Sequence, residues 1–212
     1  MGILPLMVDL SNQRVVVVGG GQVAERRVLN LAEWGVTPEV ISPALTSGLD
    51  ALWKEQSITW KQKTFDPSDL QGAFFIVAAT NQPAVNQQII DSAPKDSLIN
   101  DAEKAERGNV YIPASIKRGR LSISISTNGA SPLLAGQLKK QMEQDFDEEY
   151  GNYIEFLYEA RKLIKHSMLS KEKQQSLLKE LLAEQFLLEE KQMKMIDWLY
   201  MLLKKEDEQC LD

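Results

Sequence analysis

The chain has 212 residues, with 24 Lys and Arg against 30 Asp and Glu, and a formal net charge of -6 at pH 7. Its 43% hydrophobic and 25% charged residues are typical of a globular protein with a proper core, which excludes the disordered and fibrous classes. The acidic balance argues against nucleic acid as the main partner, because binding phosphates requires a surplus of Lys and Arg.

Cysteine and histidine are scarce, which limits the chemistry available to the chain. Cys210 is the single cysteine, so an internal disulfide and a cysteine-based metal cluster are excluded. His166 is the single histidine, which excludes sites that need two imidazoles, and we predict no metal site. Catalysis must therefore come from carboxylates, hydroxyls, backbone amides or a bound cofactor.

Nothing in the sequence predicts export or membrane insertion. The start of the chain lacks the basic region of a signal peptide, and Pro5 and Asp9 interrupt its apolar run. The sequence has no stretch of about 18 uncharged apolar residues, so we expect no membrane span. These features predict a soluble, cytoplasmic protein.

The first hundred residues alternate short β-branched runs with amphipathic stretches, which is the pattern of a parallel sheet with crossover helices. Residues 15–18 are all valine, as expected for a strand that is covered on both faces. The pattern predicts an α/β fold, with a doubly wound, Rossmann-type parallel sheet over residues 1–112. Its predicted strands are 14–18, 36–42, 57–60, 73–79 and 97–100, and its predicted helices are 23–34, a stretch from Pro43 to about 55, and 84–92.

Two further strands are predicted in the middle of the chain, at residues 108–113 and 121–126. The second alternates apolar and hydroxyl side chains, so it should have one buried and one polar face. Residues 117–120 between them form a basic turn in this interpretation.

The remainder of the sequence is expected to be helical. Ser131 is suited to cap a helix, with Pro132 as its first residue, and a break near 169–171 should start another helix with Ser170 as its cap. We therefore predict a small strand-plus-helix segment over 113–145 and a helical C-terminal domain over 146–212.

A glycine-rich motif follows the first predicted strand and precedes the first predicted helix. Gly19, Gly21 and Ala24 match G-x-G-x-x-A in the context that dinucleotide binding requires. Gly19 would permit the tight turn, Gly21 would let the backbone approach a pyrophosphate, and Ala24 would keep the helix close to the sheet. The alternative is a glycine-rich turn without a ligand.

The acidic residue that usually binds the adenosine ribose, about 20 residues beyond the glycines, is missing. Ser42 stands at the end of the second strand and is the candidate for that hydrogen bond. No Arg is present there to hold a 2′-phosphate, so NAD is favoured over NADP. Thr80 and Asn81 end the fourth strand in the same crevice, where they either contact the cofactor or only cap the next helix.

Asp101 ends the fifth strand, so its carboxylate should lie at the mouth of the crevice, where a general acid or base is useful. An ordinary loop aspartate is the competing interpretation. A basic cluster also stands out in this acidic chain, and it either binds a polycarboxylate ligand or forms a solvated turn. Its members are Lys104, Arg107, Lys117, Arg118 and Arg120.

The order of these motifs resembles the precorrin-2 dehydrogenase family, which includes bifunctional dehydrogenase/ferrochelatases and the corresponding domain of siroheme synthases. The resemblance covers about residues 1–145. It is carried by PLMVDL, VVVVGGGQVAERR, VISP, FIVAATN, INDA, IPA and SISTNGASPLLA.

The resemblance implies NAD-dependent oxidation of precorrin-2, a reduced tetrapyrrole, to sirohydrochlorin, by a homodimer whose subunits meet through residues 113–145. It implies that Asp101 acts in dehydrogenation. It also implies cofactor contacts from Gln22, Val23, Pro43 and Ala44. Precorrin-2 carries several carboxylates, so we expect Arg118 and Arg120 of the basic cluster to bind it. Thr127 and Asn128 of the polar loop that follows are the other predicted substrate contacts.

Two alternatives remain open from the sequence. A bifunctional enzyme would also insert ferrous ion into sirohydrochlorin, since members of the family exist with and without this activity. A non-catalytic NAD-sensing module is the alternative from another class of protein. Such modules usually carry an acidic residue after the second strand, where this chain has Ser42.

Overall fold

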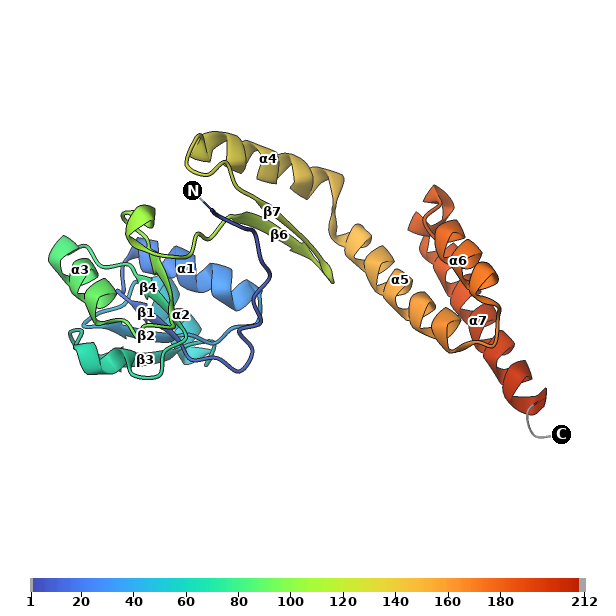
Figure 1. The fold of residues 1–212 in the computed structure, drawn as a ribbon, viewed down its shortest axis with the longest axis horizontal. Coiled ribbons are helices and arrows are strands. Elements are labelled where there is room, and N and C mark those ends of the chain that lie inside the picture. Colours follow the sequence, from blue (N-terminus) through green and yellow to red (C-terminus); the bar gives the residue numbers. More distant parts are fainter. Residues whose placement is uncertain (1, 210–212) are drawn as a thin grey trace. The chain divides into compact units, whose positions relative to one another are not determined.

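The computed structural model describes residues 2–209, which divide into two compact units, one ending at Ile112 and the other starting at Pro113 (Figure 1). Cys210 lies outside the described residues. No helix in the described part of the chain is both long enough and apolar enough to cross a bilayer.

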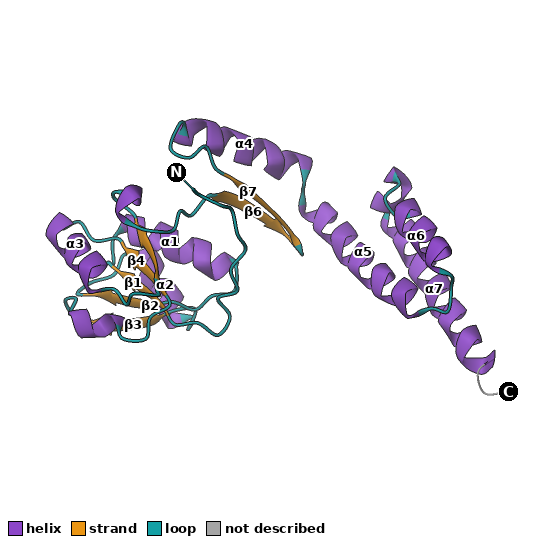
Figure 2. Cartoon of the chain, in the orientation of Figure 1, coloured by secondary structure: helices purple, strands orange, loops and turns teal. Residues whose placement is uncertain are grey.

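The first unit contains a five-stranded, all-parallel sheet in the order β3-β2-β1-β4-β5 (Figure 2). This confirms the predicted Rossmann-type sheet. The central strands β1 and β4 are fully buried because all their side chains are apolar and both of their faces are covered. The strands are β1 (Val15–Val18), β2 (Glu39–Ser42), β3 (Thr59–Gln62), β4 (Phe75–Ala78) and β5 (Leu98–Asp101).

Alternate residues of β1 point into two separate apolar cores, one on each face of the sheet. Val15 and Val17 pack with α1 (Gln22–Glu33) and α2 (Ser47–Lys54). Val16 and Val18 pack on the other face, with α3 (Pro83–Ser92) and the 3-10 turn η1 (Pro67–Leu70). The strands and helices of this unit begin within about four residues of their predicted positions.

The second unit starts with a two-stranded antiparallel sheet and continues as helices. The sheet pairs β6 (Ala114–Arg118) with β7 (Leu121–Ile125). As predicted, Ser131 caps a helix that starts with Pro132, and Ser170 caps the helix after the break. The helices are α4 (Pro132–Asp145), α5 (Glu148–His166), α6 (Lys171–Glu180) and α7 (Glu189–Gln209), with the 3-10 turn η3 (Glu184–Leu187) between α6 and α7.

The prediction of a strand at 108–113 is wrong. After the 3-10 turn η2 (Ala105–Arg107), the backbone N–H groups of Asn109 and Val110 both donate to the carbonyl oxygen of Ile99, at 2.9 and 3.1 Å. The segment is therefore a loop held against β5, and β6 begins only after Pro113. Consequently, residues 117 and 118 belong to a strand, and the turn itself is at Gly119, whose φ is +55°.

An apolar cluster formed by α5, α6, η3 and α7 organises the helical region. Leu199 of α7 is buried in it, whereas Met193 and Tyr200 of the same helix are exposed. His166 is exposed at the end of α5, where its Nδ1 lies 2.7 Å from the carbonyl oxygen of Lys162.

Candidate functional site

The carboxyl ends of the parallel strands bring the predicted cofactor residues and Asp101 to one edge of the sheet. Val18 at the end of β1 pairs with Ile41 of β2 and with Ala78 of β4, and Ala78 pairs with Asp101 of β5. The glycine loop, the β2–α2 loop, Thr80 and Asp101 therefore follow neighbouring strands at the edge where open α/β sheets bind ligands.

Packing explains the first two glycines of the loop. Gly19 has φ +130°, and a Cβ there would lie 2.3 Å from the carbonyl oxygen of Ala79. A Cβ on Gly20 would lie 1.9 Å from the carbonyl oxygen of Ala44. The carbonyl oxygen of Gly20 also accepts a hydrogen bond from the N–H of Thr46 at 3.0 Å, so the glycine loop and the β2–α2 loop are fixed against each other.

Gly21 differs, because no packing contact requires a glycine there. Its backbone is extended, with φ -89°, and a Cβ at this position would have no heavy atom within 4 Å. Gly21 is the N-cap of α1, and no side chain caps the helix. The first N–H groups of α1 are thus available beside open space, an arrangement that fits the pyrophosphate of a dinucleotide.

The three residues after Gly21 divide between the open space and the sheet. Gln22 and Val23 are exposed on the first turn of α1, whereas Ala24 is fully buried against the sheet. The small side chain of Ala24 allows the close packing of helix on sheet that the motif predicts.

Ser42 has a different environment from the one expected for a ribose ligand. It is 3% exposed, and its hydroxyl donates a hydrogen bond to the carbonyl oxygen of Ala44. Its own carbonyl oxygen accepts from the indole Nε1 of Trp60 at 3.0 Å. Ser42 therefore shapes the β2–α2 loop from inside, while Pro43 and Ala44 are exposed on it.

Asn86 of α3 fixes the loop that follows β4. It is 1% exposed, its Oδ1 accepts from the N–H and the hydroxyl of Thr80, and its Nδ2 donates to the Thr80 carbonyl oxygen. Thr80 thus is held by its neighbours, while Asn81 beside it is exposed. The sequence prediction did not include Asn86. Its one sequence signal is its position three residues before the buried Ile89, which places this polar side chain on the buried face of α3.

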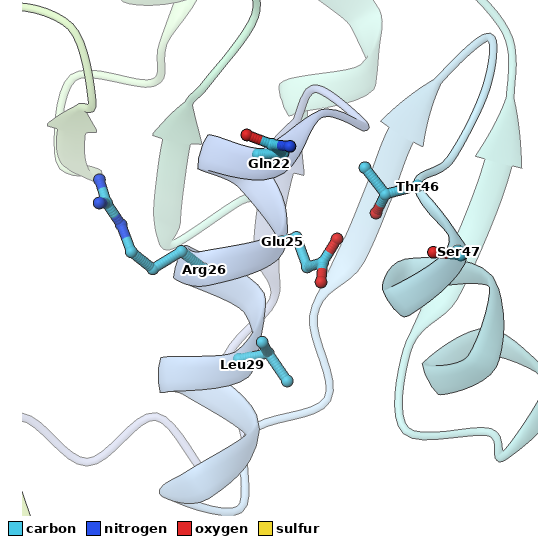
Figure 3. Close-up of a pocket in the computed structure, with 6 residues that line it drawn as sticks. All are labelled: Gln22, Glu25, Arg26, Leu29, Thr46 and Ser47. Atoms are coloured by element: carbon cyan, nitrogen blue, oxygen red, sulfur yellow. The ribbon is translucent and has the colours of Figure 1, made fainter.

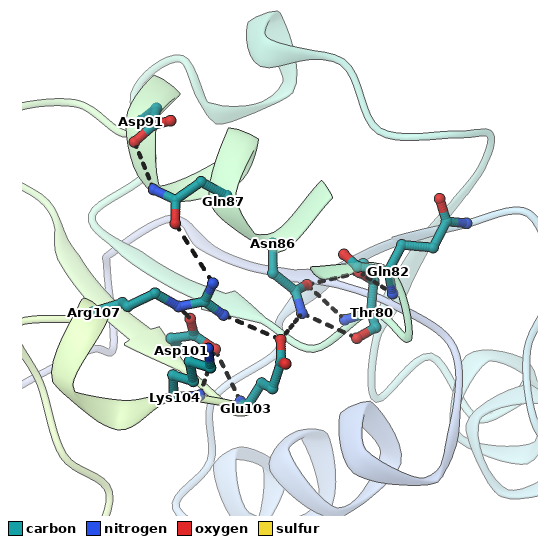
Figure 4. A network of polar contacts seen from close by, with 9 residues as sticks. All are labelled: Thr80, Gln82, Asn86, Gln87, Asp91, Asp101, Glu103, Lys104 and Arg107. Atoms are coloured by element: carbon teal, nitrogen blue, oxygen red, sulfur yellow. Dashed lines mark hydrogen bonds and ion pairs between the residues drawn. The ribbon is translucent and has the colours of Figure 1, made fainter. Parts of the chain in front are cut away.

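Asp101 is 1% exposed, and both of its carboxylate oxygens are engaged (Figure 4). Oδ1 accepts from the N–H groups of Glu103 and Lys104, at 2.8 and 3.1 Å. Oδ2 accepts from Nε of Arg107 at 2.6 Å. Burial opposes the charge of Arg107, but the hydrogen bonds and negative charges of Asp101 and Glu103 outweigh it and raise the pKa of the guanidinium.

Glu103 connects this ion pair to the loop after β4. Its Oε2 lies 3.1 Å from NH2 of Arg107 and 3.3 Å from Nδ2 of Asn86. Figure 4 shows the resulting chain of contacts from Asp101 to Thr80. Side chains therefore link the loops that follow β4 and β5. No pattern in the sequence indicates that Glu103 makes this link.

The basic cluster predicted from the sequence is divided between the two units. Arg107 belongs to the first, whereas Arg118 and Arg120 belong to the second. Nε of Arg118 donates to the carbonyl oxygen of Phe146 at 3.0 Å, and its side chain is 17% exposed. Arg120, 52% exposed, pairs with Glu155 at 3.0 Å.

The polar loop after β7 is also in the second unit. The hydroxyl of Thr127 accepts from the N–H of Ser131 at 3.1 Å, next to the start of α4. Asn128 is exposed in the left-handed region, with φ +48°. Among the described side chains, no group of three or more carboxylates, imidazoles or thiols converges as a metal site.

An open pocket of about 560 Å³ lies between the first turns of α1 and α2, beside the glycine loop (Figure 3). Glu25 of α1 faces Thr46 and Ser47 across it, and Arg26 extends from the other side of the helix. Its lining residues are Gln22, Glu25, Arg26, Leu29, Thr46 and Ser47.

Three family profiles match consecutive parts of the chain. An NAD(P)-binding family matches residues 6–114, the central region of the sirohaem biosynthesis protein matches 118–144, and the SirC C-terminal domain matches 150–195. Precorrin-2 dehydrogenase of Priestia megaterium is 39% identical over 181 residues, which are 85% of this chain and 90% of that protein. The chain belongs to the precorrin-2 dehydrogenase family.

Further comparisons agree with this family. Precorrin-2 dehydrogenase of Bacillus subtilis is 36% identical over 75% of this chain and 98% of its own length. The solved structure of SirC, precorrin-2 dehydrogenase, matches with a TM-score of 0.78 and 36% identity, covering 94% of this chain and 100% of that one. Siroheme synthase of Xylella fastidiosa is 36% identical over 77% of this chain but only 35% of its own length.

Proposed function

We propose that this protein oxidises precorrin-2 to sirohydrochlorin with NAD as the hydride acceptor. The observation that carries the proposal is Gly21, which is open on its Cβ side at the uncapped start of α1, in a member of the precorrin-2 dehydrogenase family. The family supports a nicotinamide cofactor and a tetrapyrrole substrate. It does not favour the NAD-sensing alternative.

The cofactor would be held by the glycine loop and the loops beside it. The N–H groups of Gln22 and Val23 would bind the pyrophosphate, and the exposed Pro43 and Ala44 would line the adenosine side. Strands β2 and β4 flank β1, so Asn81, which follows β4, lies across the glycine loop from Pro43 and Ala44. Asn81 would therefore contact the nicotinamide half of the cofactor. When bound, the nicotinamide ring accepts the hydride that the macrocycle loses.

Asp101 is the residue that we propose to receive the proton lost with the hydride. Oδ1 already accepts from two backbone N–H groups, so Oδ2 is the oxygen that takes up the proton. Arg107 must release Oδ2 for this step, and its side chain, 21% exposed, is the member of the pair with room to move. Before that step, Arg107 fixes the orientation of the carboxylate.

The carboxylates of the substrate require cationic partners, and the second unit offers them. We propose that Arg120 binds a substrate carboxylate directly, because its guanidinium is half exposed. Arg118 is anchored to Phe146 and contributes positive charge from a fixed position. Thr127 and Asn128 complete the proposed set from the loop after β7.

We further propose a cytoplasmic homodimer that is assembled through residues 113–145. The support is an apolar surface on α4, where Leu133 is 84% exposed and Leu134 is 46% exposed. Side chains of this size at such exposure favour coverage by a second subunit.

The deciding experiment is an anaerobic assay of the purified chain with precorrin-2 and NAD+. The proposal predicts stoichiometric NADH and the absorption spectrum of sirohydrochlorin. Binding of NAD+ without turnover would instead indicate a sensor module and would overturn the proposal.

A further inference from the structure

Glu25 carries a carboxylate whose position the motif does not explain. It lies on the first turn of α1, and a Cβ added to Gly48 would lie 2.2 Å from its Oε1. The carboxylate therefore lies directly over the first turn of α2, where only a glycine leaves room for it. Figure 3 shows it directed from α1 towards Thr46 and Ser47.

The start of α2 would otherwise attract an anion. Thr46 caps the helix by accepting from the N–H of Leu49 at 3.3 Å, while the N–H groups of the first helical residues have no partner within the helix. Such a terminus favours phosphate groups. Glu25 fills this position with negative charge, and its carboxylate forms no hydrogen bond or ion pair with any residue in the described part of the chain.

The pocket places this carboxylate on the adenosine side of the proposed cofactor site. Its lining runs from Gln22, beside the pyrophosphate position, to Thr46 and Ser47, which follow the exposed Pro43 and Ala44 in the β2–α2 loop. In dinucleotide-binding sheets, an acidic residue on this side accepts hydrogen bonds from the adenosine ribose. Here the end of β2 offers only Ser42, whose hydroxyl is turned inward.

We propose that Glu25 of α1 replaces the acidic residue missing from β2 and sets the preference for NAD over NADP. Its carboxylate accepts a hydrogen bond from the ribose 2′-hydroxyl and repels a 2′-phosphate. The helix start that would bind this phosphate is thereby closed to it. The inference rests on the proposed nicotinamide cofactor, and it assigns the choice between the two dinucleotides to one side chain.

The test is the binding of NAD+ and NADP+ measured by isothermal titration calorimetry, without precorrin-2. Glu25→Gln keeps the shape of the side chain and removes its charge. We expect it to lower the ratio of the NADP+ Kd to the NAD+ Kd by about tenfold or more. The matched control is Glu55→Gln, which makes the same change at the exposed far end of α2 and should leave the ratio unchanged.

A second variant moves the carboxylate without removing it. In Gly48→Ala, the added methyl would lie 2.2 Å from Oε1, so the flexible end of Glu25 must shift. We expect NAD+ binding to weaken by about threefold or more. Gly2→Ala is the control, because a Cβ at this exposed position would have no heavy atom within 4 Å.

The outcomes separate this inference from the proposed function. A wild-type chain that binds neither dinucleotide would remove the proposed cofactor and this inference together. Selective NAD+ binding that survives Glu25→Gln would overturn the role of Glu25 and leave the dehydrogenase proposal intact. A lower melting temperature with an unchanged ratio would show that Glu25 only stabilises the start of α2.

Discussion

Nε of Arg107 lies 2.6 Å from Oδ2 of Asp101, and the carboxylate of this pair is buried at the end of β5. The same guanidinium contacts Glu103, which contacts Asn86, so the pair is connected to the loop after β4. This arrangement makes Asp101 both an organiser of its own loop and the proposed proton acceptor. The two roles can be separated by mutation.

Asp101→Asn removes the proton acceptor and keeps a similar shape. We expect precorrin-2 oxidation to fall by about 100-fold or more, in the range seen when a general base is lost. The Kd of NAD+ should change by less than about twofold, since Asp101 is not among the residues proposed to hold the cofactor. NADH absorbance and calorimetry measure the two effects. Asp96→Asn, an exposed aspartate before the start of β5, is the control. Oxidation at the wild-type rate in Asp101→Asn would rule out the base.

Arg107→Ala leaves the carboxylate in place but removes the group that orients it. We expect kcat to fall by about tenfold, less than in Asp101→Asn, because misplacing a reacting group is costly but does not remove it. The KM for NAD+ should stay unchanged. Lys104→Ala removes an exposed positive charge from the same loop and should have no such effect. Equal losses in the Arg107 and Asp101 variants would show that the two residues act only as one structural unit.

Gly19 and Gly21 should respond in opposite ways to a methyl group. Gly19→Ala forces a Cβ to 2.3 Å from the Ala79 carbonyl oxygen at a positive φ, so we expect a loss of more than about 3 kcal/mol in unfolding free energy. In Gly21→Ala the added Cβ has no heavy atom within 4 Å, so we expect the free energy of unfolding to fall by no more than about 1 kcal/mol, the difference between Gly and Ala at a helix N-cap. The NAD+ Kd of this variant should nevertheless rise by about tenfold, because the methyl enters the proposed pyrophosphate position. Urea denaturation and calorimetry together test this pair, and unchanged NAD+ binding in Gly21→Ala would contradict the proposed position of the cofactor.

Asn86→Ala should act on stability, because it leaves the buried polar groups of Thr80 without their partner. We expect a decrease of about 2 kcal/mol in the free energy of unfolding. Gln88→Ala, two residues further along α3 and exposed, should change it by less than about 0.5 kcal/mol. Equal stability of the two variants would show that these hydrogen bonds contribute little.

The sequence predicted the parallel sheet because its signals are local. The valine run of β1, the glycines after it and the capping residues Ser131 and Ser170 each fix their own segment. The prediction of a strand at 108–113 failed because the backbone of this segment bonds to the carbonyl oxygen of Ile99. A hydrogen bond between backbone groups leaves no pattern in the side chains.

The candidate site shows the same division between local and long-range features. Glycine spacing predicts the loop, and the end of a strand predicts Asp101 at the edge of the sheet. The contact that links the loops after β4 and β5 joins Asn86 to Glu103, 17 residues apart in the sequence, and no local pattern predicts it. The position of Glu25 over Gly48 depends on how α1 and α2 pack, which the sequence does not specify.

Arg120 and Arg118 provide the last test, because they are close in sequence but differ in their surroundings. The guanidinium of Arg120 lies 3.6 Å from the ring centre of Tyr158 and is half exposed, so it can bind a substrate carboxylate without leaving a buried partner. We expect Arg120→Gln to raise the KM for precorrin-2 by about tenfold, with a smaller change in kcat, which is typical of lost substrate binding. Arg118→Gln should mainly lower stability, because Nε of Arg118 donates to the carbonyl oxygen of Phe146. Arg161→Gln, which removes an exposed charge from α5, is the control for net charge. A KM for precorrin-2 that rises equally in Arg120→Gln and Arg161→Gln would mean that overall charge, rather than Arg120 itself, attracts the substrate.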